Sequence, residues 1–408
     1  MRTLADRLAE MRAERGGPAP ARAARSTTDR AEILARWFGA RLQIAPDGAA
    51  VVVERRVSLT AATVENLVGL PSACYFDTET TGLSTGAGTV VFLAGLGHLE
   101  GGTLVVRQLL LPDYPHEAAL LRLVAGDLAA LPRVVTYNGR GFDLPLLTTR
   151  LTFHRLFREM AALPEHHDDL LPVARRLYRR PLGGARLADV EFGVLGVVRN
   201  SDCPGSEVPS RYFGYLRGGS PDLLTDVLDH NLQDVVSLAL LEAEIVRMRA
   251  GGWRQAPVLD PHGMAVELLR DGASEEALEV VEAAMLPGVD QDRAHSLRRM
   301  ATRLLISAGQ LDRAEELWTA ATRRASSDAA AAWLEVARIR ERHRGDLHGA
   351  LEAAVTGSRV LDLAFSLGRG GSMLEVGRVR LRLDARLRRL RRWVAAADRR
   401  AAREARVA

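Results

Sequence analysis

The pattern of hydrophobic and polar positions divides the chain into two regions that favour different structures. From Ser72 to about Met248, short apolar runs alternate with stretches of amphipathic helical spacing. From Pro261 to about Leu367 the strand-like runs disappear and helical spacing continues. Apolar residues that recur every two positions indicate a strand, whereas recurrence at three and four positions indicates a helix. The sequence therefore predicts an α/β region followed by an all-α region.

The α/β region is expected to form a mixed sheet with helices on its faces. The expected strands lie at 51–59, 73–80, 89–100, 103–111 and 133–139, and the expected amphipathic helices lie at 115–132 and 142–156. Gly101 and Gly102 separate two of these strands, and such a pair favours a tight hairpin. A meander of strands followed by a helix and a further strand is typical of a mixed sheet.

A glycine and an alanine recur at fixed positions in the all-α region. The motif Gly-x4-Ala occurs at Gly272 and Ala277, Gly309 and Ala314, and Gly345 and Ala350. A period in the mid-thirties predicts paired helices that stack into a solenoid. The pattern resembles degenerate tetratricopeptide repeats, and we expect residues 255–370 to form this domain. Such repeats would dock a protein partner or guide a substrate.

The two ends of the chain differ from these regions. Residues 1–50 are expected to form N-terminal helices and a flexible linker, because 16–28 is rich in glycine, proline and small residues. Residues 371–408 are expected to form an Arg-rich C-terminal helix or tail. From Arg378 to Ala408 the chain has many arginines and few acids, which fits either a solvated helix face or attraction to phosphate.

Composition and charge favour a soluble, cytoplasmic protein. A length of 408 residues, 47% of them hydrophobic and 26% charged, is typical of a globular chain with more than one core. The two cysteines are too few for a disulfide framework. The N-terminus has no signal-peptide core, and the apolar run from Val90 to Leu99 is too short to span a bilayer. No membrane partner is expected. All 55 basic residues are arginines, so any cationic phosphate contact must come from a guanidinium.

Acidic residues follow the expected strands in an order that suggests a metal site. Asp77 and Glu79 lie two residues apart at the end of an apolar strand, and Asp143 follows a later strand. Asp234 lies on an amphipathic helix, four residues after His230, so both side chains share one helix face. Carboxylates that converge on one point need compensating cations. Hard oxygen ligands favour Mg²⁺ or Mn²⁺, and paired ions can activate water against a phosphodiester.

These motifs resemble those of a known group of nucleases. The order Asp-x-Glu, Asn…Asp and His-x3-Asp resembles the four-acid 3′-5′ exonucleases of the ribonuclease-H-like superfamily. More narrowly, residues 72 to 245 resemble the YprB-like family of predicted exonucleases. The matching stretches are FDTETTGLSTGAGT, VTYNGRGFDLPLL, HHDDLLPVARRLYRR, the segment with Leu195-Gly196, Pro204-Gly205, Pro209 and Tyr212, and HNLQDVVSL. The resemblance implies a ribonuclease-H-like α/β domain at 51–250 and phosphodiester hydrolysis with two divalent ions.

The resemblance also implies roles for individual residues. It implies that the ligands of the two Mg²⁺ or Mn²⁺ ions are Asp77, Glu79, Asp143 and Asp234. His230 would orient or deprotonate the attacking water, although it stands where better-known relatives have a tyrosine, and this leaves the general base open. The residues expected to contact the substrate are Thr80, Leu83, Asn138 and Asn231. For both asparagines the alternative is that they hold local backbone.

Other interpretations of two acidic segments stay open at this point. Asp143 could simply begin a helix, where an aspartate is a common cap. The cluster His166 to Asp169 fits the N-terminus of a helix better than a metal site, because the helix dipole favours acids there.

The sequence thus predicts a metal-dependent nuclease, most consistent with a 3′-5′ exonuclease acting on a single-stranded end of DNA or RNA. The alternative is a non-catalytic nucleic-acid-binding or scaffold protein that uses the same fold and recruits partners through its helical repeats. The presence of all four acids favours the enzyme, because a decayed site would usually have lost one.

Overall fold

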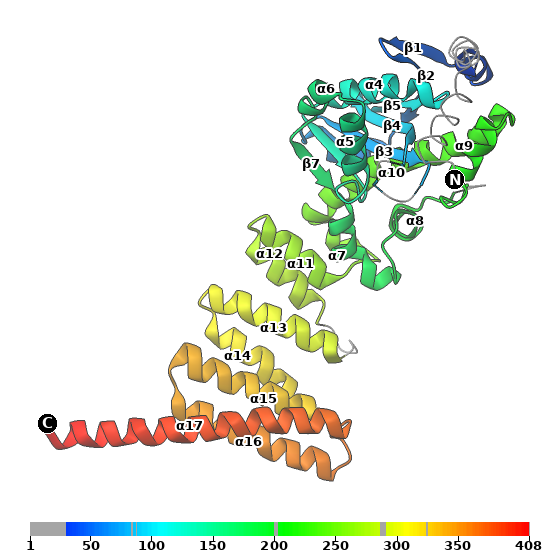
Figure 1. The fold of residues 1–408 in the computed structure, drawn as a ribbon. Coiled ribbons are helices and arrows are strands. Elements are labelled where there is room, and N and C mark those ends of the chain that lie inside the picture. Colours follow the sequence, from blue (N-terminus) through cyan, green and yellow to red (C-terminus); the bar gives the residue numbers. More distant parts are fainter. Residues whose placement is uncertain are drawn as a thin grey trace, which may run out of the picture. The chain divides into compact units, whose positions relative to one another are not determined.

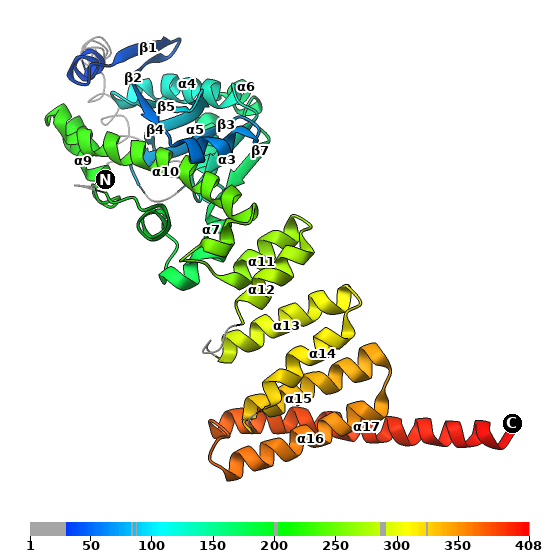
Figure 2. The same cartoon turned by 180° about the vertical axis from the view of Figure 1, so that it is seen from behind.

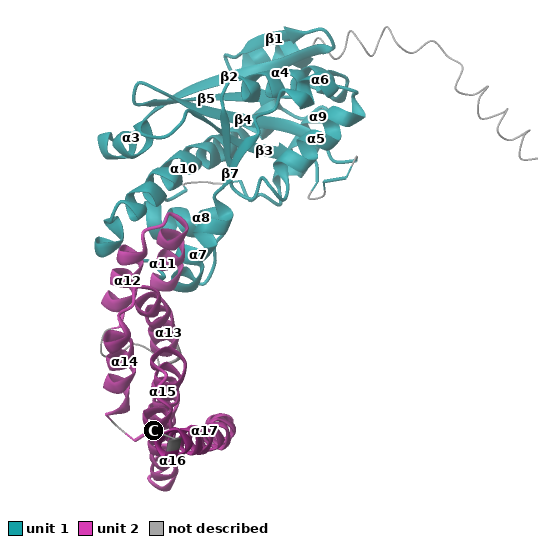
Figure 3. Cartoon of the chain, turned by 90° about the vertical axis from the view of Figure 1, so that its left-hand side faces the viewer, with its two compact units in different colours: residues 1–260 teal, residues 261–408 magenta. Residues whose placement is uncertain are grey.

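The computed structural model of the chain describes residues 30–82, 85, 86, 88–199, 203–285, 291–323 and 325–407. It forms two compact units, residues 1–260 and residues 261–408 (Figure 3). The expected N-terminal helix and the linker at 16–28 lie outside the described residues, as does Leu83. In the described part of the chain, no helix is both long enough and apolar enough to cross a bilayer.

A seven-stranded mixed sheet lies at the centre of the first unit (Figure 1). The strand order is β1-β2-β5-β4-β3-β6-β7, with β6 parallel to β3 and β7 and the other neighbours antiparallel. The strands are β1 (Arg41–Ala45), β2 (Gly48–Ser58), β3 (Ala73–Thr80), β4 (Val91–Glu100), β5 (Thr103–Leu110), β6 (Arg133–Thr136) and β7 (His166–Asp169). The expected mixed sheet is confirmed.

The hairpin between β4 and β5 follows the sequence closely. Gly101 and Gly102 have φ angles of +52° and +89°, the left-handed conformation that a two-residue hairpin turn requires. Two strands, in contrast, were not expected. β1 and the start of β2 lie within the segment 1–50, so the sheet begins before residue 51. Residues His166–Asp169 were expected at a helix N-terminus but form β7, because their backbone pairs with β6 whatever the polarity of the side chains.

Helices cover both faces of this sheet. α10 packs against β3, β4 and β5 on one face, and α4 packs against β2, β4 and β5 on the other (Figures 2 and 3). The helices of the first unit are one over 30–37, α3 (Ala61–Val68), α4 (Glu117–Ala129), α5 (Asp143–Phe153), α6 (Phe157–Ala161), α7 (Leu171–Leu182), α8 (Leu187–Val190), α9 (Val208–Leu216) and α10 (Thr225–Arg249). Short helical segments are η1 (Tyr114–His116), η2 (Glu191–Leu195), η3 (Pro221–Leu224) and η4 (Gly252–Gln255).

Two glycines of β4 allow α10 to lie close on the sheet. A Cβ on Gly95 would overlap the side chain of Asn231 and lie 2.8 Å from Val235 Cγ2. A Cβ on Gly97 would lie 2.6 Å from Val235 Cγ1. Both separations are too short for carbon atoms, so only glycine permits this approach at either position. The approach brings polar side chains of α10 directly over β3.

The described part of the second unit is entirely helical. Its helices are α11 (Pro261–Arg270), α12 (Ser274–Ala283), α13 (Gln291–Ser307), α14 (Leu311–Thr319), α15 (Ser327–Ile339), α16 (Leu347–Ser366) and α17 (Met373–Val407), with η5 (Ala320–Thr322) and η6 (Arg340–Arg344) between them. The expected all-α region is confirmed. Neighbouring helices in the chain pack on one another from α11 to α17.

The recurring Gly-x4-Ala motif marks equivalent places in three helix pairs. The glycines at 272, 309 and 345 have φ angles of +81°, +74° and +70°, and each lies in the turn before the second helix of a pair. The alanines at 277, 314 and 350 are fully buried in that second helix. A left-handed turn residue ends one helix, and a small residue lets the next one pack closely. The spacing read from the sequence therefore reports a repeated helix–turn–helix unit.

Candidate functional site

Alternate residues of β3 face α10. The hydroxyl of Tyr75 donates to Glu242 of α10 at 2.7 Å, and Asp77 and Glu79 follow on the same side of the strand. Successive side chains of a strand point to opposite faces, so the Asp-x-Glu spacing places both carboxylates on one face. The sequence ACYFDTET thus presents two acids to the helix that carries His230.

Asn231 holds Asp77 from above the sheet. Its Nδ2 donates to Asp77 Oδ2 at 2.9 Å, and its Oδ1 accepts from Gln108 Nε2 at 3.0 Å. Asp77, Gly95 and Gln108 are direct cross-strand neighbours, so Asn231 lies over Gly95 and joins the outer two. Asn231 was expected to contact the substrate. In the structure its side chain is fully buried and hydrogen-bonded on both sides, so it orients Asp77 instead.

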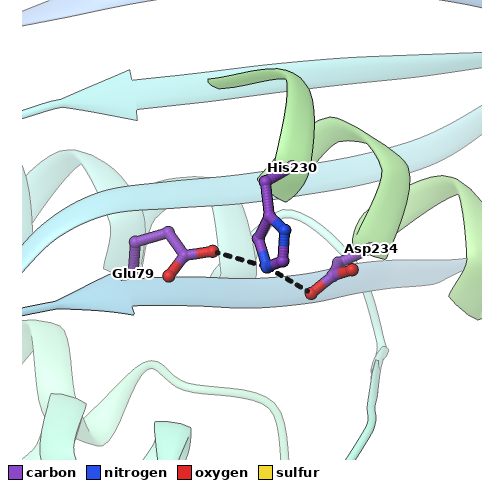
Figure 4. A group of neighbouring side chains, drawn as sticks. All are labelled: Glu79, His230 and Asp234. Carbon is purple, nitrogen blue, oxygen red and sulfur yellow. Dashed lines mark ion pairs between the residues drawn. The ribbon is translucent and has the colours of Figure 1, made fainter. Parts of the chain in front are cut away.

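His230 lies between two carboxylates (Figure 4). Its Nε2 is 3.6 Å from Glu79 Oε1 and 3.6 Å from Asp234 Oδ2. One ligand atom from each of these three residues lies within 4.8 Å of the other two, which is close enough for a shared metal ion. The i, i+4 spacing of His230 and Asp234 on α10 brings both side chains to the same face, as the sequence predicted.

Asp143 reaches the site from the first turn of α5. Its side chain is almost fully buried, and Thr78 Oγ1 donates to its Oδ1 at 2.5 Å. Thr78 lies between Asp77 and Glu79 on β3 and points to the opposite face of the sheet. Asp143 therefore does begin a helix, and it also lies beside the acidic end of β3.

The charges of these acids act on one another. Burial raises the pKa of Asp77 well above its usual value, and repulsion from Asp234, Asp143 and Glu79 raises it further. Burial also raises the pKa of Asp143 to about 6, although the hydrogen bond from Thr78 opposes the shift. Burial raises the pKa of Asp234 above its usual value, although the charges of His230 and Arg199 oppose the shift. The structure thus places Glu79 and Asp234 around His230, and the charges of Asp143, Asp234 and Glu79 all act on Asp77.

Arg199 is a member of the site that the sequence did not reveal. Its Nη2 donates to Asp234 Oδ1, and its Nε and Nη2 donate to Glu191 at 2.6 Å and 2.7 Å. Glu191, only 1% exposed, also accepts from Ser237 at 2.5 Å. Arg199 and Glu191 lie in a segment without strand or helix periodicity, so no pattern could have identified them. Their ion pair compensates part of the negative charge around Asp234.

Arg199 also fixes which nitrogen of His230 carries a proton. Its Nη1 is 3.2 Å from His230 Nδ1. A guanidinium has donors and no acceptor, so Nδ1 must accept and the proton of the neutral ring lies on Nε2. That N–H is directed between Glu79 and Asp234. For Nε2 to bind a metal ion or accept a proton, the contact between Arg199 and Nδ1 would have to be released.

The remaining expected substrate contacts lie in turns that flank the site. Thr80, at the end of β3, is 7% exposed and donates through Oγ1 to Gly82 O at 2.6 Å. Asn138 is exposed in the turn between β6 and α5, with a φ of +68°. Its backbone N–H donates to Asp169 Oδ1 at 2.8 Å. The hydroxyl of Thr80 therefore holds local backbone, and the Asp169 carboxylate holds the backbone at Asn138. A contact of either side chain with substrate stays a prediction.

The donor set fits divalent cations. Carboxylate oxygens are the ligands that such ions prefer, and a cation between them would remove the repulsion that raises the pKa of Asp77. Among the described residues, Glu79 and Asp234 lie close enough to share one ion with His230, whose imidazole fits only in its other tautomer.

Comparisons with known proteins agree with this geometry. A family model described as the RNase_H superfamily matches residues 74–246, a span that contains every acid of the site. Over 286 residues the chain is 34% identical to the uncharacterized protein YprB of Bacillus subtilis (strain 168), covering 69% of this chain and 67% of YprB. The superfamily has a nuclease-type fold that typically uses divalent metals. The chain therefore belongs to the RNase H superfamily, in the same family as YprB.

Proposed function

We propose that this protein is a divalent-metal-dependent nuclease that hydrolyses phosphodiester bonds as a 3′-5′ exonuclease on single-stranded ends of DNA or RNA. The observation that carries the proposal is the buried carboxyl of Asp77, on which three further carboxylates act. Such mutual repulsion destabilises a fold unless a cation offsets it. Two Mg²⁺ or Mn²⁺ ions would provide that offset and the chemistry of hydrolysis at once.

The four acids would bind the ions, and the residues hydrogen-bonded to the acids would orient them. Asp77, Glu79, Asp143 and Asp234 would be the ligands. When bound, the ions would lower the pKa of a water molecule and stabilise the leaving oxygen. Asn231 fixes the orientation of Asp77 through its amide. Partners of this kind around a metal ligand typically contribute about 10–100-fold to metal affinity or activity.

His230 would act first as a hydrogen-bond donor. While Arg199 donates to Nδ1, the Nε2–H can orient a phosphate oxygen or the attacking water, but it cannot take a proton. A role as general base would require release of Arg199 and the other tautomer of the ring. The proposal therefore assigns His230 to orientation and leaves deprotonation of the water to its metal-lowered pKa.

The test is a product analysis on labelled DNA and RNA oligonucleotides with free or blocked 3′ ends, in Mg²⁺, Mn²⁺ or EDTA. The parent should shorten free-ended strands stepwise. Asp77→Asn and Asp234→Asn should lower the rate by roughly 10²–10³-fold, the loss typical of removing one group that stabilises developing charge. Asp229→Asn, an exposed acid beside His230, is the matched control and should behave as the parent. A parent that degrades nothing, or site variants with full activity, would refute the proposal.

The alternative is a nucleic-acid-binding or scaffold protein without turnover, with helical repeats that recruit a protein partner. Binding without any product in every metal tested would indicate it. The repulsion at Asp77 argues against it, because it would lower the stability of the fold without serving a function.

A further inference from the structure

The solvent-facing side of α17 carries a row of arginines. Arg388, Arg392, Arg399, Arg403 and Arg406 follow one another at intervals of 4, 7, 4 and 3 residues. With about 3.6 residues per turn, these intervals return to the same side of a helix. All of these side chains are exposed. The row, called the arginine stripe below, extends over about 27 Å, since a helix rises about 1.5 Å per residue.

The opposite side of α17 is fixed to the second unit. Leu383, Leu387 and Leu390 are buried, and α17 packs against α15 and α16. Beyond Val394, which is also buried, the helix continues to Val407 and extends away from those neighbours (Figures 1 and 2). The packed half therefore holds the stripe in a defined orientation on a rigid support.

The stripe differs from the other arginines of α17 in its charge balance. Arg386 and Arg389 both contact Glu341, and Arg400 pairs with Glu404. Among the residues that the structure describes, the guanidiniums of the stripe have no carboxylate within ion-pair distance. Arginines that only solubilise a surface are commonly interspersed with acids. The stripe instead presents uncompensated positive charge along a straight line.

We propose that the arginine stripe binds the sugar–phosphate backbone of a nucleic acid, as a contact additional to the proposed hydrolytic site. The inference takes its class of partner from the proposed function. A phosphodiester backbone is a regular line of negative charge, and about 27 Å corresponds to about 8 base pairs at roughly 3.4 Å each. Guanidiniums bind phosphate oxygens through paired hydrogen bonds, which suits a surface made of arginine alone.

The composition of the helix disfavours other anionic partners. From residue 395 to residue 406 every uncharged residue is alanine. A helix that lies on a membrane needs large apolar residues on the side away from its charges. A protein interface needs aromatic or large apolar anchors at its centre. From 395 to 406 the surface of arginine and alanine supplies neither, and phosphate recognition requires neither. Trp393, the exposed aromatic within the span of the stripe, lies under the guanidinium of Arg389.

The test compares two variants of the full chain that have the same net charge. The stripe variant carries Arg399→Gln, Arg403→Gln and Arg406→Gln, at exposed positions where glutamine keeps the helix. The control carries glutamine at three other exposed arginines of the second unit, Arg323, Arg359 and Arg369. Circular dichroism should show equal helix content and equal melting for both variants.

Binding of labelled single- and double-stranded DNA and RNA is measured by fluorescence anisotropy over a range of salt concentrations, in EDTA so that hydrolysis is excluded. Each lost phosphate contact should reduce the slope of log Kobs against log [salt] by about 0.7–0.9. The stripe variant should therefore lose about 2–3 units of slope on at least one nucleic acid, and the control less than about 1. Equal slopes for the two variants would overturn the inference. So would a stripe variant that loses binding only to phosphatidylserine vesicles or to polyglutamate.

The outcome separates this inference from the proposed function. If the parent hydrolyses nothing but its binding depends on the stripe, the nuclease proposal fails and the stripe proposal stands. If the parent hydrolyses its substrate while the stripe variant binds like the control, only the stripe proposal fails.

Discussion

Asn231 and Asp77 are joined by a hydrogen bond of 2.9 Å that runs from the amide of a buried helix residue to a carboxylate of the central strand. The bond exists because Gly95 leaves room for the asparagine over the sheet. Gln108 binds the other end of the same amide and so fixes which way it points. An acid that repulsion and burial both disfavour in its ionised form is thus held in one orientation.

Loss of the Asn231 amide should weaken metal binding at Asp77. Asn231→Ala removes the donor and leaves the carboxylate free to rotate, so the affinity for Mn²⁺ and the rate of hydrolysis should each fall by about 10–100-fold. Isothermal titration calorimetry measures the first and oligonucleotide cleavage the second. Asn138→Gly keeps the left-handed turn at an exposed asparagine and should leave the affinity for Mn²⁺ unchanged. Metal affinity that survives Asn231→Ala would show that the bond does not orient Asp77.

Neutralising Asp77 should stabilise the metal-free protein while abolishing hydrolysis. Asp77→Asn removes the charge that its three carboxylate neighbours repel, and asparagine Oδ1 can still accept from Asn231. We expect a gain of roughly 0.5–2 kcal/mol in the free energy of unfolding, as at other functional sites that are built against stability. Urea unfolding in EDTA measures it, with Asp229→Asn as control. A loss of stability instead would mean that Asp77 is not under repulsion.

Metal binding should weaken as the pH falls through about 6. Burial raises the pKa of Asp143 to about 6, so in more acidic solution a cation must displace its proton. In the metal-free protein, the contribution of Asp143 to stability depends on pH in the opposite direction to that of an ordinary ion-paired aspartate. A raised pKa contributes stability below the unfolded value of about 3.8, and that stability is lost as the pH rises through about 6.

Titration of Mn²⁺ by calorimetry at several pH values, in buffers of different ionisation enthalpy, checks this by the protons released. Asp143→Asn should reduce both the proton release and the slope of affinity against pH. An affinity that is the same at pH values about two units apart on either side of 6 would contradict the shift.

His230 should be observed as the Nε2–H tautomer in the metal-free protein. Two-bond ¹H–¹⁵N NMR distinguishes the tautomers, and among the 10 histidines the loss of one signal in His230→Gln assigns it. Removing Arg199 should abolish the preference, because Nδ1 then loses its donor.

Arg199→Ala alone would leave the buried Glu191 without its cationic partner, at a cost of about 3–5 kcal/mol. The experiment therefore compares Glu191→Gln with the double variant Glu191→Gln/Arg199→Ala. If the double variant kept the Nε2–H tautomer fully, Arg199 would not be its cause.

The parts of the site that lie on regular elements could be predicted from the sequence. The alternation of β3 placed Asp77 and Glu79 on one face of the strand, and helical spacing placed His230 and Asp234 on one face of α10. A signal for Asn231 was also present, because Val227, Asn231 and Val235 recur every four residues and all three are buried. Its place on that buried stripe argues against a direct contact with substrate.

Other features depend on tertiary contacts that no local pattern encodes. β7 consists of two histidines and two aspartates, so hydrophobicity gave no sign of a strand that forms only because β6 offers its edge. The ion pair joins Glu191, the first residue of η2, to Arg199, which lies eight positions later and beyond the end of η2. The contact of Arg199 with Asp234 joins this segment to α10, which is far from it in the sequence.

The lack of a side chain at Gly95 matters for identifying functional residues in such proteins. It carries no reactive group, yet a single methyl there would act as a wedge that lifts α10 and separates Asn231 from Asp77. Gly95→Ala would thus inactivate the site although every proposed metal ligand and every charge is still present. A survey that ranks positions by the reactivity of their side chains would pass over it. Which substitutions this site tolerates thus depends on its glycine positions as well as on its acids.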